Sequence, residues 1–189
     1  MRPLLALALL SLALPGHAAW RVLGPGGGGA QFNPTLSAVD PNLVLVSCDM
    51  TGSYVSHDGG DSWRMFNLRD VTRFFVLDPL DANIIYAAND GLYRSRDKGK
   101  TWELIYPDPK NVERVAITGD HGDEKIVTRD GSQETVDALA VDPANSAVLF
   151  VAIRKKDGAG LYRSADSART WKLLASLPTE TRAIYVDPA

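Results

Sequence analysis

The sequence predicts an all-β protein built from repeated four-stranded units. Three observations predict it: an eight-residue pattern occurs three times, a shorter marker precedes each copy, and no stretch carries a sustained helical period. Units of roughly 40–50 residues with four short strands each are typical of the blades of a β-propeller. The chain of 189 residues accommodates about three such blades and the start of a fourth, so the predicted propeller is incomplete.

The eight-residue pattern, called the box below, reads S-x-D-x-(G/A)-x-(S/T)-W. Its aspartate is suited to accept hydrogen bonds from the backbone of a tight turn, its glycine to adopt a positive φ, and its tryptophan to cover the base of a hairpin. The third copy has Ala168 where the others have glycine, which predicts a strained or differently shaped turn. We expect a structural role for Asp58, Gly60, Trp63, Asp97, Gly99, Trp102, Asp166 and Trp171.

The shorter marker is a hydrophobic residue followed by Asp-Pro, and it sets the spacing of the units. The second box begins 39 residues after the first, whereas the third begins 69 residues after the second, which is one period plus about 30 residues. The middle of the extra segment, Val112 to Val127, is expected to form a hairpin. We predict blades at about 35–68, 71–106 and 134–175, a partial unit at 181–189, and an insertion at 107–133.

Alternation and turn residues place the strands inside a unit. In the second unit they predict strands at Val71–Leu77, Ile84–Ala88, Leu92–Ser95 and Thr101–Tyr106. A tight turn at Asn89-Asp90-Gly91 is expected between the second strand and the third.

The first residues carry the features of a secretory signal. A basic start is followed by a short apolar run and then by small residues, which predicts a signal peptide at 1–18 and a mature chain at 19–189. An uncleaved anchor is the alternative. We expect a secreted or periplasmic protein that leaves the membrane after cleavage, and the sole cysteine, Cys48, is expected to be a small buried residue because one cysteine makes no internal disulfide.

Charge and composition limit the partners. The net charge of −3 with no basic stripe argues against nucleic acid and fits a sugar or another neutral polymer. His57 and His121 share no spacing with a cysteine or carboxylate pair that is typical of a zinc site. We expect no metal and no cofactor.

The boxes resemble the Asp-box, or BNR, repeat of sialidases, sortilin-type receptors, photosystem II assembly propellers and the xyloglucan hydrolases of glycoside hydrolase family 74. The resemblance implies the fold more than the function, since one fold supports many sites. The Arg-Ile-Pro typical of sialidases near the first strand is absent from the sequence.

The N-terminal region is similar to the opening of family 74 enzymes. The resemblance rests on the glycine run 26–29, on Phe32-Asn33-Pro34, and on Cys48-Asp49-Met50-Thr51-Gly52-Ser53-Tyr54, where the family has T-D-(I/M)-G-G-x-Y. It departs from that pattern at Cys48 and Thr51. The resemblance implies that Asp49 is one of two catalytic carboxylates, and that its partner belongs to a second propeller further along the chain; Gly28, Gly29 and Tyr54 are the expected substrate-binding residues.

Two functions stay open at this point. The first is the N-terminal part of a polysaccharide-active glycoside hydrolase, which needs two carboxyl groups about 6.5–9.5 Å apart if it inverts and is therefore inactive as this chain alone. In the second, a non-catalytic propeller binds protein partners through its rim loops, and Asp49 merely organises a turn.

Overall fold

The computed structural model describes residues 21–26, 29–50, 52–119, 123–132 and 134–187. These residues form strands and turns with one short 3-10 turn, which confirms the all-β class. The strands are β1 (Gln31–Leu36), β2 (Val44–Cys48), β3 (Gly52–Ser56), β4 (Arg64–Phe66), β5 (Phe74–Leu77), β6 (Ile85–Ala88), β7 (Leu92–Ser95), β8 (Glu103–Tyr106), β9 (Val112–Thr118), β10 (Asp123–Thr128), β11 (Thr135–Asp142), β12 (Asn145–Lys155), β13 (Gly158–Ser164) and β14 (Lys172–Leu177), and the 3-10 turn η1 is Pro109–Asn111.

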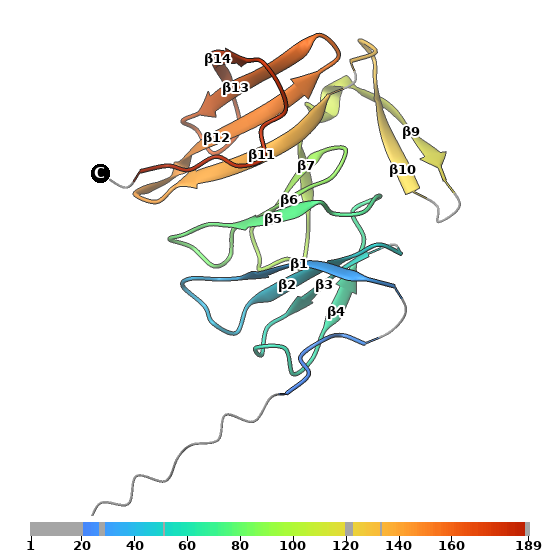
Figure 1. Ribbon diagram of the computed structural model, residues 1–189, viewed down its shortest axis with the longest axis vertical. Helices are drawn as coiled ribbons and strands as arrows, with labels where there is room; N and C mark the ends of the chain where they lie inside the picture. The colour runs from blue at the N-terminus through green and yellow to red at the C-terminus, as the bar shows by residue number, and fades with distance from the viewer. Residues whose placement is uncertain (1–20, 27–28, 51, 120–122, 133, 188–189) are drawn as a thin grey trace, which may run out of the picture.

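Three four-stranded antiparallel sheets make up most of the molecule. Each is a simple meander: β1-β2-β3-β4, β5-β6-β7-β8 and β11-β12-β13-β14. The sheets are stacked in chain order, and β5 lies between β1 and β11, so the first strands of the three sheets are neighbours (Figure 1). This is the arrangement of propeller blades around an axis, and the described sheets do not close a ring.

The strands of the second sheet lie close to the predicted ones. Leu92–Ser95 is a strand as expected, and the other three begin one to three residues later than alternation predicts. The Asn89 amide donates to the Gly91 carbonyl at 2.9 Å, so the expected tight turn is present. Between the second and third sheets, β9 and β10 pair as a separate two-stranded hairpin, where the sequence predicts one.

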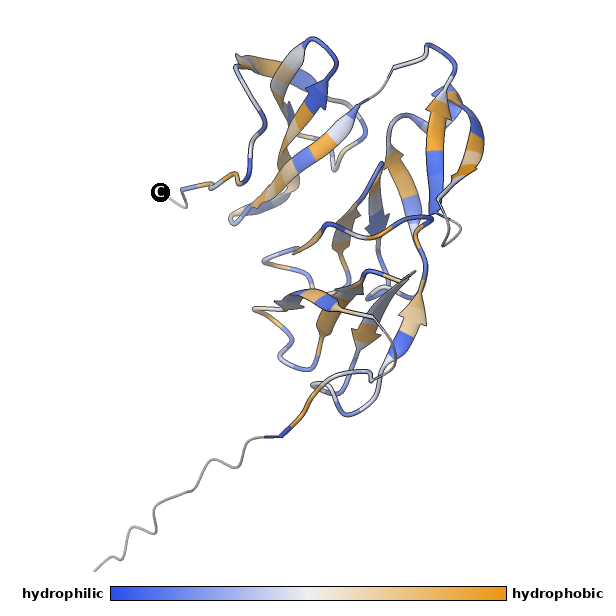
Figure 2. Ribbon diagram, turned by 45° about the vertical axis from the view of Figure 1, so that its right-hand side comes forward, coloured by the Kyte–Doolittle hydropathy of each residue, from blue (hydrophilic) through white to orange (hydrophobic). Residues whose placement is uncertain are grey.

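The core lies between the sheets, and β6 shows why. Ile85 and Ala87 point toward the first sheet and pack with Leu45 and Val55, whereas Tyr86 and Ala88 pack against the third sheet. Because successive side chains of a strand point to opposite faces, a strand buried on both sides needs a continuous apolar run, which β6 provides. Figure 2 shows hydrophobic residues along the strands and hydrophilic residues at many of the turns.

Strand register divides the molecule into two rims. In the first sheet Leu36 pairs with Val44, which pairs with Ser56, at the end that leads into the box. At the other end Gln31 pairs with Cys48 and Cys48 with Gly52, next to Asp49. We call these ends the box rim and the Asp49 rim. The β9–β10 hairpin lies on the Asp49 rim, since Glu124 N donates to the carbonyl of Arg69, which lies in the loop that follows β4.

The first two boxes are hydrogen-bonded turns of the same design. In the first, Ser62 donates to both oxygens of Asp58, from its amide at 2.8 Å and from its hydroxyl at 2.6 Å. The Gly60 amide donates to Ser56 Oγ, and Trp63 Nε1 donates to the Gly60 carbonyl at 3.1 Å. Asp97, Gly99 and Trp102 repeat these contacts in the second box.

The third box keeps the aspartate and loses the tryptophan bond. Asp166 accepts from Thr170 as in the other copies, but Trp171 Nε1 is buried without a hydrogen-bond partner. Ala168 has φ +64°, whereas Gly60 and Gly99 have +98° and +80°. The third box therefore combines a smaller φ at the substituted position with a tryptophan that lacks its hydrogen bond, and this is the form that the expected distortion takes.

Arginines join neighbouring sheets at the box rim. Arg64 of the first sheet donates to the Gly99 carbonyl in the second box. Arg94 of the second sheet donates to the Ser167 carbonyl in the third box and pairs with Glu103. Each of these two boxes therefore also carries a contact between sheets.

No helix in the described part of the chain has the length and apolarity to cross a membrane. The predicted signal peptide at 1–18 lies outside the described residues. The predicted behaviour of Cys48 is confirmed in one respect, because its side chain is buried.

Candidate functional site

Asp49 lies in the turn that joins β2 to β3 and is exposed on the rim named after it. One carboxylate oxygen, Oδ1, accepts a hydrogen bond from the Ala30 amide at 2.8 Å. In return the Asp49 amide donates to the Ala30 carbonyl at 3.2 Å. This two-way contact fixes the side chain against the segment that enters β1, and among the described residues nothing donates to the second oxygen, Oδ2.

Gly29 packs directly against this carboxylate. Its φ is +89°, and a Cβ at this position would lie 2.5 Å from Asp49 Oδ1 and 2.4 Å from Met50 Cγ. A close approach of this kind requires glycine. The structure thus places Gly29 beside Asp49, while Gly28, the other expected substrate-binding glycine, lies outside the described residues.

Tyr54 is in the middle of β3, opposite Val46 on one side and Met65 on the other. Leu45 and Val55 belong to the core shared with the second sheet. By strand alternation Tyr54 therefore lies on the face of the first sheet that points away from the second. The structure brings Gly29 and Asp49 together and leaves Tyr54 on this sheet face.

A charged cluster that the sequence reasoning missed lies where the first strands converge. Asn33 in β1 donates to the Arg73 carbonyl at 2.7 Å and to Ser47 Oγ at 3.2 Å, which connects the cluster to β2, the strand that precedes Asp49. Arg73 and Arg154 both pair with Asp137, which is almost fully buried.

Spacing from the Asp-Pro marker is the signal that identifies two members of this cluster. Arg73 precedes Asp78 by five residues, and Asp137 precedes Asp142 by the same number. Equivalent positions in consecutive units lie at the same height beside the axis, so charged residues there are neighbours. Burial lowers the pKa of Arg73, which indicates a guanidinium held partly away from water.

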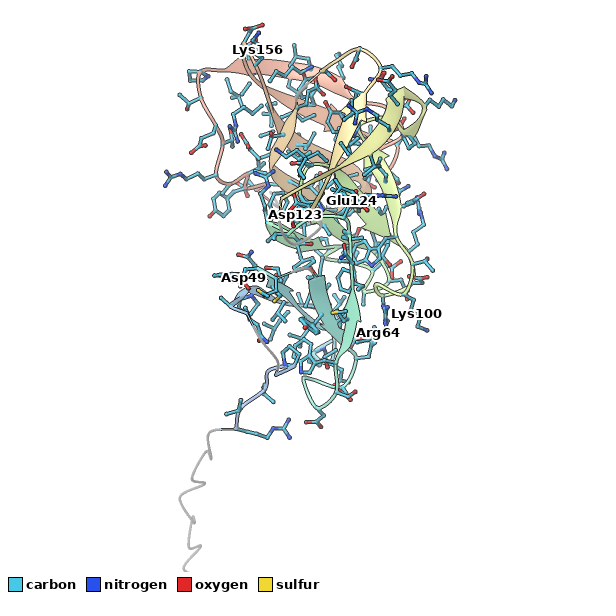
Figure 3. All side chains as sticks on the ribbon, turned by 90° about the vertical axis from the view of Figure 1, so that its right-hand side faces the viewer. Asp49, Arg64, Lys100, Asp123, Glu124 and Lys156 are labelled. Carbon is cyan, nitrogen blue, oxygen red and sulfur yellow. The ribbon has the colours of Figure 1, made fainter. Side chains whose placement is uncertain are left out.

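The box aspartates are separate from this region. They lie on three sheets at the box rim, and hydrogen bonds from the nearby hydroxyl groups of Thr101 and Thr170 lower the pKa of Asp97 and of Asp166 to about 2. In Figure 3 Asp49 lies well apart from Lys100 of the second box and from Arg64. Three carboxylates satisfied by their own turns are suited to hold hairpins rather than to share one reaction.

No group of three or more His, Cys, Asp or Glu side chains suited to a metal ion occurs in the described part of the chain.

The fold and the repeated boxes place the protein among the β-propellers, as a partial propeller of three blades. No family model matches the sequence. Over 189 residues the chain is 29% identical to xyloglucanase Xgh74A of Acetivibrio thermocellus, covering 88% of this chain and 20% of that enzyme. It is 28% identical over 207 residues to a xyloglucanase of Hypocrea jecorina, covering 96% of this chain and 22% of that one.

Solved structures agree on the fold. The chain superposes on an ancestral glycoside hydrolase family 74 enzyme with a TM-score of 0.59 and 18% identity, covering 85% of this chain and 20% of that one. A chain in a nidogen/laminin complex gives a TM-score of 0.51 with 12% identity, covering 78% of this chain and 49% of that one. The protein is therefore similar to family 74 propellers, and it spans about a fifth of the length of the curated relatives.

Proposed function

We propose that this chain is the N-terminal part of an exported polysaccharide-active glycoside hydrolase resembling family 74. The observation that carries the proposal is the rigid placement of Asp49 on the Asp49 rim, in a chain similar to xyloglucanases over 88% of its length. The fixed Oδ1 holds the carboxylate in one orientation, and Oδ2 is left to act on a ligand. A preorganised carboxylate of this kind is what glycoside hydrolysis requires.

Asp49 would supply one of the two carboxyl groups, and the second would come from a propeller that this chain does not include. Hydrolysis by inversion needs one protonated carboxyl group to donate to the leaving oxygen and one ionised carboxylate to activate water. The chain by itself is therefore expected to bind a glucan chain weakly and not to cleave it.

Titration of the purified chain with xyloglucan oligosaccharides tests the proposal. We expect Asp49→Ala to weaken binding by roughly fivefold, the effect of one lost hydrogen bond. Asp61→Ala is the matched control, because Asp61 is an exposed carboxylate on the box rim whose ion-pair partner among the described residues is the exposed Arg21. Equal affinity of wild type and Asp49→Ala, or release of reducing sugar by the chain alone, would contradict the proposal.

Export is the second part of the proposal. Expression with the natural N-terminus in a secreting bacterium should yield an extracytoplasmic protein whose sequence begins near residue 19, because residues 1–18 have the composition of a signal peptide. A full-length protein retained in the membrane would support the uncleaved anchor instead.

The alternative function is a non-catalytic propeller that binds a protein partner. One observation favours it: the β9–β10 hairpin projects from the sheets (Figure 1) and presents Ile117 with 76% of its surface exposed. Contact with a partner protein would remove this apolar side chain from water, which is favourable. Binding of glycans that is insensitive to Asp49→Ala, together with capture of one partner that is lost in Ile117→Asp, would favour this alternative.

A further inference from the structure

The β9–β10 hairpin is fastened to the first sheet, although it follows the second sheet in the sequence. Glu124 in β10 donates its amide to the Arg69 carbonyl at 2.8 Å, and its carboxylate pairs with the Arg69 guanidinium at 2.6 Å. Arg69 lies in the loop that follows β4. The hairpin therefore adds a third wall to the groove between the first two sheets.

The three walls enclose a pocket of about 760 Å³. They are formed by the end of β4 with the loop after it, by β8 with the second box, and by the hairpin. The corresponding groove between the second and third sheets, beside Trp171, encloses about 400 Å³ and has no wall from the described part of the hairpin. Volumes of about 300–1,000 Å³ are typical of sites for small ligands, so the larger pocket has room for a short oligosaccharide.

Most of the side chains that line this pocket are apolar or aromatic. Phe66 and Trp102 stack on each other, with ring centroids 5.0 Å apart. A sugar ring carries C–H groups on its faces and oxygens at its edge, so it suits a pocket with apolar walls and a few polar groups. The aliphatic members of the wall are Leu68, Leu104, Val112, Val115 and Ile126.

One polar atom of the wall has no partner. Tyr93 in β7 has only 6% of its surface exposed, and its hydroxyl makes no hydrogen bond with any described residue. Burial raises the pKa of Tyr93 to about 12, so the hydroxyl keeps its proton at neutral pH and is able to donate. A buried hydroxyl without a partner is unfavourable, and an oxygen of a ligand in the pocket would accept its hydrogen bond.

The charges around this hydroxyl do not favour an anion. Arg69 is paired with Glu124, and the negative charges of Asp70 and Asp90 also act to raise the pKa of Tyr93. The other cation that lines the pocket, Lys100, belongs to the second box, at the opposite end. The chemistry beside the hydroxyl therefore suits a neutral ligand.

We propose that this pocket binds a sugar unit of a neutral glucan, which accepts a hydrogen bond from Tyr93 and packs its ring against the apolar walls. The inference rests on the proposed function for the class of polymer and adds a second contact with it. No residue of the turn that holds Asp49 lines the pocket. In Figure 3 Glu124 and Lys100, from the two ends of the pocket, lie apart from Asp49.

Calorimetric titration of the full chain with cellotetraose tests the proposal, and its repetition in Asp49→Ala leaves out binding at the Asp49 turn. Tyr93→Phe removes only the hydroxyl, so we expect binding to weaken by about three- to tenfold, the effect of one neutral hydrogen bond. The melting temperature of this variant should be equal to or above that of the wild type, because the hydroxyl has no partner in the free protein. Weaker binding without lower stability separates a ligand contact from a structural role.

Tyr86→Phe is the matched control for the hydroxyl. Tyr86 lies on the neighbouring strand, packs against the third sheet and contacts Arg94. Its loss should lower the melting temperature and leave the affinity for cellotetraose unchanged.

A second pair of variants tests the space itself. Val115→Phe places a larger side chain in the pocket and should weaken binding by at least about tenfold. Ile117→Phe makes the same kind of change two residues further along β9, where the side chain is exposed and does not line the pocket, and should have no effect.

Three outcomes would overturn the proposal: unchanged affinity in Tyr93→Phe, equal affinities of Val115→Phe and Ile117→Phe, or tighter binding of a glucuronic acid tetramer than of cellotetraose. Cellotetraose binding that is lost in Asp49→Ala and unaffected by Val115→Phe would also overturn it and would leave the role of Asp49 standing. Cellotetraose binding that survives Asp49→Ala and is weakened by Val115→Phe, while xyloglucan binding is insensitive to Asp49→Ala, would support the pocket and refute the role of Asp49.

Discussion

At the scale of single residues, the three boxes form a natural substitution experiment. The sequence predicts that Ala168 distorts its turn, because alanine is strained at the positive φ that glycine adopts there. In the structure the affected group is the indole of Trp171, whose Nε1 is buried without a hydrogen-bond partner. The aspartate bonds survive because they depend on residues 164, 166 and 170, which carry the same hydroxyl and carboxylate groups as their equivalents in the other boxes. The indole bond depends on the carbonyl of the substituted residue itself.

Ala168→Gly is therefore expected to stabilise the protein by about 1 kcal/mol. Relief of a left-handed alanine and recovery of one hydrogen bond each contribute about 1 kcal/mol, and the greater freedom of glycine in the unfolded chain offsets up to about 1 kcal/mol of that. Urea unfolding of both proteins measures the difference. Gly99→Ala, the reverse change in the second box, should destabilise by a similar amount, and stabilisation by both changes would refute the explanation.

Two of the glycines before β1 allow a similar comparison at the candidate site. Gly26 and Gly29 both have positive φ, but a Cβ on Gly26 meets nothing within 4 Å, whereas one on Gly29 meets Asp49 Oδ1 at 2.5 Å. Both alanine variants place a Cβ on a residue with positive φ, but we expect only Gly29→Ala to weaken binding of xyloglucan oligosaccharides, by displacing Asp49. Equal binding by the two variants would show that the position of Asp49 is unimportant for the ligand.

At the scale of elements, turn chemistry made the strands predictable. Strands separated by boxes or by Asn-Gly-type turns are found within a few residues of their expected positions, since these turns are specified by local residues. The hairpin at β9–β10 follows the same rule. The first strand of the second sheet begins three residues later than predicted, at Phe74. Arg73 still donates its amide to Ala88 of β6, but its carbonyl and its side chain contact the first and third sheets, which no local pattern encodes.

The boxes also predict how the elements respond to acid. Hydrogen bonds hold the pKa of Asp97 at about 2, below the value of about 3.9 for an unfolded chain. A depressed pKa contributes stability that is present above about pH 4 and is lost as the pH falls toward 2. We expect the urea concentration at the midpoint of unfolding to fall as the pH is lowered from about 4 toward 2, and this fall to be smaller in Asp97→Asn. An identical slope in that variant would assign the acid sensitivity to other carboxylates.

At the scale of the whole molecule, contacts between sheets decide whether three blades behave as one body. Arg94 has only 8% of its side chain exposed and joins Glu103 to the third box, whereas Arg96 reaches the same glutamate from an exposed position. The sequence predicts neither role, because the two arginines lie only two residues apart, Arg94 in β7 and Arg96 in the second box, and nothing in the local pattern tells which of them is buried. Likewise the charged cluster brings together residues from Asn33 to Arg154, and the sequence alone shows only the equal spacing of Arg73 and Asp137 from the Asp-Pro marker.

Arg94→Met should cost about 1–3 kcal/mol, the range for a buried charged hydrogen-bond donor whose partner is partly exposed. Arg96→Met should cost less than about 1 kcal/mol, as is usual for exposed ion pairs. Chemical denaturation followed by tryptophan fluorescence reports both, since Trp102 and Trp171 lie on either side of the contact. Similar losses in the two variants would mean that the sheets are joined by apolar packing alone.

The separation of the two rims has a consequence for how such a chain diversifies. The boxes all lie on one rim, and the second and third boxes keep the same aspartate geometry although a hairpin is inserted between them on the other rim. Loops on the Asp49 rim can therefore lengthen without disturbing the boxes, provided that the contacts of Arg73 with the first and third sheets are kept. Recognition of different ligands is then expected to vary at that side, by changes of loop length, while the scaffold stays the same.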